Sequence, residues 1–164
     1  MAGNVFNNDY SYYHGKCCVF ISHQQKDKNA ARMIANYLIS CGIDVYFDEY
    51  DLNINRNNPH SVVNAIKAGL NKSTHLMCLL SENALQSKWV PWEVGYGYEH
   101  NVFGVLLKEV AYGKLPEYLQ VVPIYNQHEE LDAYLRSLRI SYNISDGYIR
   151  AFSAAMHPLA SIMY

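Results

Sequence analysis

Residues 17–29, CCVFISHQQKDKN, join a short apolar run to a polar cluster of the kind that begins a helix. Apolar side chains then recur at helical spacing over residues 28–40, and Gly42 is placed to end that helix. The stretch therefore predicts a buried strand, a loop and a helix in immediate succession. Strands that alternate with helices in this way favour an α/β fold built on a parallel sheet.

The same alternation continues along the rest of the chain. Further strands are predicted at 44–47, 75–80, 102–107 and 121–125, and further helices at 61–70, 91–100 and 128–139. The spacing of Ile149, Phe152, Met156 and Leu159 predicts a final helix. Nearly continuous apolar strands are typical of sheets that are covered on both faces.

We therefore expect a doubly wound, flavodoxin-like parallel sheet of five strands in the order 2-1-3-4-5. The whole chain, 1–164, is predicted to be a single domain. Its core would cover about residues 16–139, and a helical extension would follow at about 140–164.

The composition excludes several classes of protein. Half of the residues are hydrophobic, and 13 Lys and Arg against 15 Asp and Glu leave a net charge of -2 without a dense basic run, so a nucleic-acid partner is not expected. The apolar runs are too short to span a membrane, and the start MAGNVFNND lacks a signal peptide's apolar core. The four cysteines lack CxxC spacing and the seven histidines are scattered, which predicts reduced core thiols and no metal site. We expect a cytoplasmic protein.

The predicted sheet order also indicates where a ligand would bind. The direction of winding reverses between the first and third strands, and ligands bind outside the carboxyl ends of such strands. The chain places Ser22 to Gln25 after the first strand and Ser81 to Leu85 after the third. Asp48 follows the second strand and begins a loop that is too long for a routine connection, which is typical of functional loops.

The segment SKWVPWEVGYGY at 87–98 holds both tryptophans of the chain and a single carboxylate, Glu93. Trp89 and Glu93 are four residues apart, so a helix places them on one face at the rim of the predicted crevice. A desolvated carboxylate beside aromatic rings is a recognisable catalytic environment. The alternative is that Glu93 only stabilises the start of its helix through the helix dipole.

Segments of the sequence resemble the TIR domain family in their order and spacing. CCVFISHQQKDKNAA resembles the first family box, GIDVYFDEYDL resembles the second strand and the start of the so-called BB loop, and AIKAGLNKSTHLMCLLSENALQSKWVPWE resembles the third strand with the WxxxE motif. The resemblance covers about residues 16–139 and extends especially to the stand-alone bacterial TIR proteins of Thoeris-type antiphage defence.

The resemblance implies an activity. In enzymatic TIR domains the WxxxE glutamate is catalytic in cleaving the nicotinamide glycosidic bond of NAD, and Glu93 stands at that position. NAD would then be a substrate, and no cofactor is implied. The resemblance also implies that four residues lie near the substrate: Ser22, Gln24, Asp48 and Leu85. Trp89 would help to shape the pocket. His23 is a further candidate, because it directly follows the first strand. Arg56 is a candidate for holding the phosphates, because Gln24 and Gln25 stand where family members often carry a basic residue.

The sequence leaves the product and two other functions open. Attack by water would give ADP-ribose, and internal attack would give a cyclic isomer; resemblance to Thoeris proteins favours a signal that a downstream effector reads. Self-assembly through TIR–TIR contacts is also implied. One alternative is a non-catalytic TIR adaptor that acts only through such assembly. Another is a nucleoside deoxyribosyltransferase, a related fold that breaks N-glycosidic bonds at a glutamate.

Overall fold

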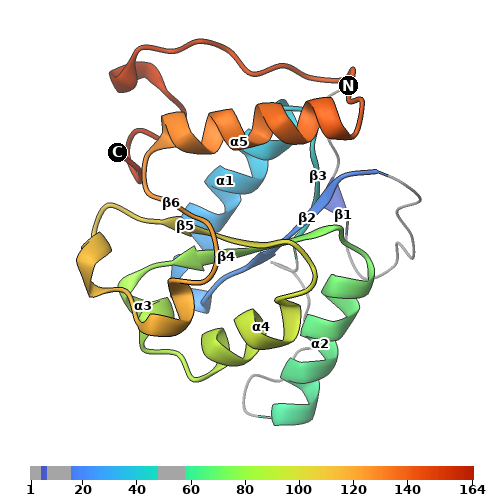
Figure 1. Ribbon diagram of the computed structural model, residues 1–164, viewed down its shortest axis with the longest axis vertical. Helices are drawn as coiled ribbons and strands as arrows, with labels where there is room; N and C mark the ends of the chain where they lie inside the picture. The colour runs from blue at the N-terminus through green and yellow to red at the C-terminus, as the bar shows by residue number, and fades with distance from the viewer. Residues whose placement is uncertain (1–4, 7–15, 48–57) are drawn as a thin grey trace.

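The computed structural model describes residues 5–6, 16–47 and 58–164. Within these ranges the chain forms one sheet with helices on both of its faces (Figure 1). The strands are β1 (Val5–Phe6), β2 (Cys18–Ser22), β3 (Asp44–Tyr46), β4 (His75–Leu80), β5 (Val102–Leu106) and β6 (Ile124–Tyr125). The α-helices are α1 (Lys28–Ser40), α2 (Pro59–Asn71), α3 (Glu82–Leu85), α4 (Trp89–Gly97) and α5 (His128–Ser141), and short 3-10 turns are η1 (Gln25–Asp27), η2 (Tyr112–Lys114), η3 (Glu117–Leu119) and η4 (Ala154–Met156).

The strands of the described chain lie in the order β1-β3-β2-β4-β5-β6, and every neighbouring pair is parallel. The strands from β2 to β6 are the five predicted strands in the predicted order, which confirms the doubly wound, flavodoxin-like α/β fold. β1 adds a short edge strand in which Val5 pairs with Val45 and Phe6 with Tyr46. The polar sequence around β1 gave no strand signal.

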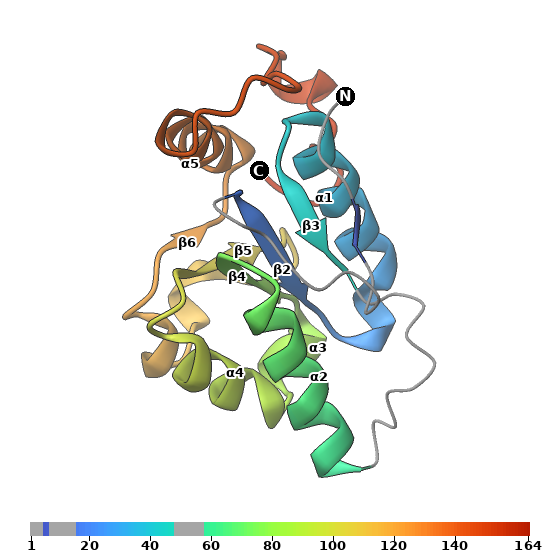
Figure 2. The same cartoon turned by 90° about the vertical axis from the view of Figure 1, so that its right-hand side faces the viewer.

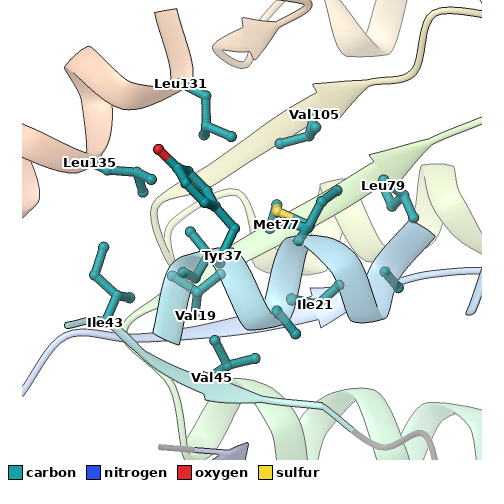
Figure 3. Close-up of a cluster of buried hydrophobic side chains, with 14 of the residues drawn as sticks. Val19, Ile21, Tyr37, Ile43, Val45, Met77, Leu79, Val105, Leu131 and Leu135 are labelled. Carbon is teal, nitrogen blue, oxygen red and sulfur yellow. The ribbon is translucent and has the colours of Figure 1, made fainter. Parts of the chain in front are cut away.

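The sheet separates two hydrophobic cores. Helices α1 and α5 cover one face, and α2, α3 and α4 cover the other (Figures 1 and 2). Successive strand side chains point to opposite faces, so Val19 and Ile21 enter the α1/α5 core while Phe20 enters the core under α2 and α4. Figure 3 shows the α1/α5 core, in which Tyr37 points from α1 toward Leu135 of α5.

All four cysteines of the chain are buried thiols outside any disulfide, which confirms the prediction of core thiols. Burial raises the pKa of the Cys17 thiol to about 11, and it also raises the pKa of Cys41. Thiols held neutral in this way are poor nucleophiles, because the thiolate is the reactive form. Cys17 and Cys41 therefore contribute packing rather than chemistry.

The ends of two helices follow from specific residues. Gly42 follows α1 with a φ of 85°, a conformation that suits glycine at a helix C-terminus. Asn58 caps α2, because its side chain accepts hydrogen bonds from the backbone N–H of His60 at 2.9 Å and of Ser61 at 3.4 Å. The prediction that α2 begins after Ser61 is therefore wrong, since Asn58 and Pro59 together provide an earlier cap and first turn.

The predicted helical extension at 140–164 is also wrong. Helix α5 ends at Ser141, and the only helical turn described beyond it is η4. Gly147 has a φ of 65°, and Pro158 has no N–H to donate, so the segment cannot continue as a regular helix. The spacing of Ile149, Phe152, Met156 and Leu159 matches a helix only by coincidence.

We call residues 143–164 the C-terminal strap. The strap runs back alongside α5 and returns to the first turn of that helix (Figure 1, dark red). Its backbone bonds to other segments, with Tyr148 N–H donating to Ser40 O at 3.3 Å and Lys108 N–H donating to Ile162 O at 2.9 Å. The strap therefore packs on the α1/α5 side of the core as an irregular segment of loops and turns.

Candidate active site

The carboxyl ends of β2 and β4 meet at the predicted crevice. Ser22, the last residue of β2, pairs in register with Cys78 of β4, and both side chains lie on the face covered by α4. The loops that follow these strands carry η1 and α3. Asp48 and Arg56, the two candidates from the long loop, lie outside the described residues.

Glu93 lies in α4 and contacts Ser22 directly. Its carboxylate accepts a hydrogen bond from the Ser22 hydroxyl, and only 7% of the residue is exposed. Gly97 lies one turn later on the same face of α4, where a Cβ would come within 2.6 Å of Leu76 Cδ2. Because Gly97 has no side chain, α4 can approach the sheet closely enough for Glu93 to reach Ser22.

Cys78 lies below this pair and stays neutral. Its complete burial and, to a lesser extent, the nearby Glu93 carboxylate raise the pKa of the thiol well above its usual value. A neutral thiol adds no negative charge beside Glu93. Glu93 thus has the Ser22 hydroxyl as a hydrogen-bond donor and an uncharged thiol nearby.

A second buried carboxylate, Asp27 of η1, joins the loops that follow β2 and β4. Ser81 Oγ donates to Asp27 Oδ2 at 2.5 Å, and Asn83 Nδ2 donates to Asp27 Oδ1 at 3.1 Å. Ser81 Oγ also accepts the N–H of Ala84 at 3.0 Å and so caps α3. These bonds fix the spacing of the two loops at the crevice. The sequence did not single out Asp27, because nothing in the polar run SHQQKDKN shows which residue is buried.

The other predicted site residues have different surroundings. His23 is buried against Phe47, with ring centroids 4.9 Å apart, and its Nδ1 lies 3.3 Å from Ile21 O. Gln24 is half-buried, and its carbonyl accepts the N–H of Asp27 at 2.9 Å. Leu85 and Trp89 are half-buried and pack on the core under α2 and α4. The structure thus brings Ser22 to Glu93 and leaves Leu85 and Trp89 on that face, while His23 packs toward β3.

A protein-family model of the TIR domain matches residues 19–138. This chain belongs to the TIR domain family. The match runs from β2 into α5 and contains both Ser22 and Glu93. TIR domains can be NAD-cleaving enzymes and commonly self-associate. A search of curated proteins found no match to the chain.

Aromatic residues of this TIR domain form a stack along α4. Trp92 lies parallel to Tyr96 with ring centroids 4.9 Å apart, and Trp89 meets Trp92 edge to face at 6.2 Å. Lys67 of α2 places its Nζ 5.7 Å from the centroid of Tyr96. Trp92 and Tyr96 therefore pack against each other, and Trp89, four residues before Glu93, lies on the same side of the helix as Glu93.

The TIR domain brings three side chains of metal-ligand type together outside the crevice. Ligand atoms of His128, Asp132 and His157 lie within 4.8 Å of one another. However, His157 Nδ1 accepts the N–H of Leu159 at 3.0 Å, so the neutral ring carries its proton on Nε2. Nε2 lies 3.0 Å from Asp132 Oδ2 and 3.1 Å from Tyr37 Oη. His157 thus has no lone pair left for a metal, and the cluster is a hydrogen-bonded network.

Across the described part of the TIR domain, none of the helices is both long and apolar enough to cross a membrane.

Proposed function

We propose that this TIR domain cleaves the nicotinamide glycosidic bond of NAD and that Glu93 is the catalytic residue. The contact between Ser22 and Glu93 carries this proposal. It places a buried carboxylate at the carboxyl ends of β2 and β4, where the winding of the sheet reverses and folds of this class bind their ligands. The helix-dipole alternative explains this position less well, because Glu93 lies in the second turn of α4 with its carboxylate directed at Ser22.

A single carboxylate is sufficient for this chemistry. Most glycosidases use two, since an acid must protonate a poor leaving group while the other carboxylate handles the oxocarbenium-like centre. The nicotinamide of NAD is already cationic and leaves as a neutral molecule, so no acid is needed on that side. As the C–N bond breaks, positive charge develops on the ribosyl carbon and ring oxygen, and a carboxylate in a site shielded from water stabilises that charge.

The neighbouring residues would position Glu93 and the substrate. The Ser22 hydroxyl fixes the orientation of the carboxylate, and Leu85 and Trp89 supply apolar surface beside it. Asp27 and Ser81 hold the two crevice loops at a constant separation. Gln24, His23 and Asp48 complete the proposed substrate-binding set, with Arg56 for the phosphates.

The proposed reaction can give either of two products. Capture of the ribosyl cation by water releases nicotinamide, ADP-ribose and a proton, whereas capture by a nucleophile of the same molecule releases nicotinamide, a cyclic ADP-ribose isomer and a proton. We extend the proposal to a bacterial cytoplasmic signal in Thoeris-type antiphage defence, read by a downstream effector, with TIR–TIR assembly completing the site. The resemblance of the sequence segments to Thoeris TIR proteins motivates this extension, and the family match supports a TIR-type function in general.

The test measures nicotinamide release from NAD by the concentrated wild-type protein, by Glu93→Gln and by Ser22→Ala. The matched control is Glu99→Gln, which neutralises an exposed carboxylate just beyond α4. We expect Glu93→Gln to lose at least about a hundredfold in rate, as when preorganised electrostatic stabilisation is removed from other active sites. Glu99→Gln should match the wild type.

Mass spectrometry of the nucleotide product separates the remaining possibilities. A product one water lighter than ADP-ribose would identify a cyclase, and ADP-ribose itself would identify a hydrolase. A wild-type protein that is silent even when crowded into assemblies, yet binds another TIR domain, would replace the enzyme by the adaptor. Cleavage of nucleosides in place of NAD would indicate the deoxyribosyltransferase.

A further inference from the structure

The C-terminal strap is fastened at both of its ends. At its beginning, the Arg139 guanidinium donates to Cys41 O at 2.5 Å, to Asp146 O at 2.5 Å and to Gly147 O at 3.1 Å. At its far end, Tyr164 O accepts the N–H of His128 at 2.6 Å. Near that end the strap inserts two apolar side chains, Leu159 and Met163, which are 0% and 1% exposed.

Between these ends the strap is held by His157. Groups from two helices face its imidazole: Tyr37 of α1, and Asp132 and His128 of α5. Tyr37 Oη donates to Asp132 Oδ1 at 2.5 Å, and His157 Nε2–H points at Asp132 Oδ2 at 3.0 Å. The His128 ring lies 4.0 Å from the His157 ring at an interplanar angle of 11°, and the Phe152 ring of the strap itself closes a further side.

This arrangement fits only the neutral form of His157. Its Nδ1 accepts the N–H of Leu159 at a distance of 3.0 Å. A protonated imidazole would carry a proton on Nδ1 as well, so two N–H donors would face each other at that distance. The added charge would also be buried, since 2% of the His157 side chain is exposed, and it would face the parallel ring of His128.

Asp132 acts in the opposite direction, because a carboxylate favours the imidazolium. Burial outweighs it: the pKa of His157 is lowered from its ordinary value, mainly by desolvation, although the charge and hydrogen bond of Asp132 raise it. Tyr37 already donates to the same carboxylate, and burial and that bond raise its own pKa, so the phenol keeps its proton. Asp132 is therefore shared between two donors.

We propose that His157 is an acid-sensitive latch: its neutral imidazole holds residues 157–164 of the strap on α1 and α5, and its protonation weakens that hold and favours their release. Release would withdraw Leu159 and Met163 from the core. It would also remove Ser161 and Ile162 from the wall of a cleft of about 370 Å³ that Lys26 and Lys108 line on the other sides. The latch is independent of the chemistry at Glu93.

The size of the effect follows from linkage. In the released strap His157 regains its ordinary pKa of 6.5, so about nine-tenths of released molecules carry the proton at pH 5.5. In the closed form burial lowers the pKa of His157, so fewer of these molecules carry the proton. Acidification from pH 7.5 to 5.5 should therefore raise the opening constant of the strap by up to about tenfold.

The test is amide hydrogen exchange of the full chain at pH 7.5 and 5.5, with each rate divided by the intrinsic rate at that pH. In the wild type, protection of residues 157–164 should fall up to about tenfold between pH 7.5 and pH 5.5. His157→Asn does not titrate but keeps an acceptor two residues before the Leu159 N–H, so its protection should not depend on pH. His100→Gln, an exposed histidine after α4, should behave like the wild type.

Two results would overturn the latch. One is wild-type protection of 157–164 that is unchanged at pH 5.5, and the other is the same pH response in His157→Asn as in the wild type. If His157→Asn does not fold, the ¹⁵N resonances of the wild-type His157 ring decide the question. Loss of strap protection must then follow the protonation of that ring, and a strap that stays protected around a protonated His157 rejects the proposal.

Discussion

His75 should make this fold sensitive to acid, and replacing His75 should remove that part of the sensitivity. His75 is the first residue of β4 and is 4% exposed, with Thr74 Oγ1 2.8 Å from its Nδ1 and the ring of Tyr142 at a centroid distance of 5.9 Å. Burial lowers the pKa of His75 from 6.5 to about 4. Between pH 6.5 and about 4, the His75 imidazole is therefore mostly neutral in the folded protein and mostly protonated in the unfolded chain.

The sign and the magnitude follow from this shift in pKa. Above pH 6.5 the imidazole is neutral in both states, and stability is unaffected. Between pH 6.5 and about 4 only the unfolded chain takes the proton, so the free energy of unfolding falls as the pH falls, by about 1.4 kcal/mol per unit. At pH 5 the loss from His75 alone should be about 2 kcal/mol.

The assay is urea unfolding at pH 7.5 and pH 5.0 for the wild type and for His75→Gln. Any cost of the substitution itself is present at both pH values, so it cancels in the difference between them. We expect the acid-induced loss to be about 2 kcal/mol smaller in His75→Gln than in the wild type. His75→Val provides a second variant, because a β-branched residue suits a strand.

His60→Gln is the matched control, since His60 is exposed on α2 and should leave the acid-induced loss unchanged. Other buried groups, His157 among them, should leave a residual acid sensitivity in His75→Gln. The reasoning is refuted if the wild type and both His75 variants lose the same free energy between pH 7.5 and pH 5.0.

Three further predictions concern α4 and the strap. Gly97→Ala should lower the rate of nicotinamide release at least about tenfold, because the added Cβ would push α4 away from Leu76 and misplace Glu93. Gly95→Ala is the control: its Cβ would contact no other atom, so this variant should retain activity in the same assay. Leu159→Ala should lower the free energy of unfolding in urea by about 2–5 kcal/mol through the cavity it leaves, whereas truncating an exposed strap residue should change it by less than about 0.5 kcal/mol. Equimolar Zn²⁺ should not raise the Tm, and a clear rise would contradict the tautomer assigned to His157.

The sequence was informative where local patterns decide the structure. The continuous apolar run of β2 and the helical spacing of α1 gave the alternation from which the sheet order follows. That Glu93 lies near the end of β2 could be predicted for the same reason, because a parallel sheet determines which loops lie at its carboxyl edge. The spacing between Trp89 and Glu93 required only that α4 be a helix.

The features that the sequence did not reveal depend on contacts between distant residues. Asp27 is buried because Ser81 and Asn83, more than fifty positions away, supply its donors. Leu159 is buried without an α-helix around it, since the strap's backbone bonds partly within itself in turns and partly to α1, to α5 and to the residues that follow β5 and β6. The helical spacing of apolar residues cannot distinguish these two ways of burying a side chain.

The strap also affects the order in which the fold can be completed. The family match ends at residue 138, but two residues beyond it, Leu159 and Met163, also belong to the α1/α5 core. On a translating ribosome, the sheet and all of the helices from α1 to α5 would therefore emerge before the side chains that complete that core. Such distant pairings slow folding, because the chain must close a long loop before they contribute. The nascent domain should consequently remain loosely packed on its α1/α5 side until the strap has been synthesised.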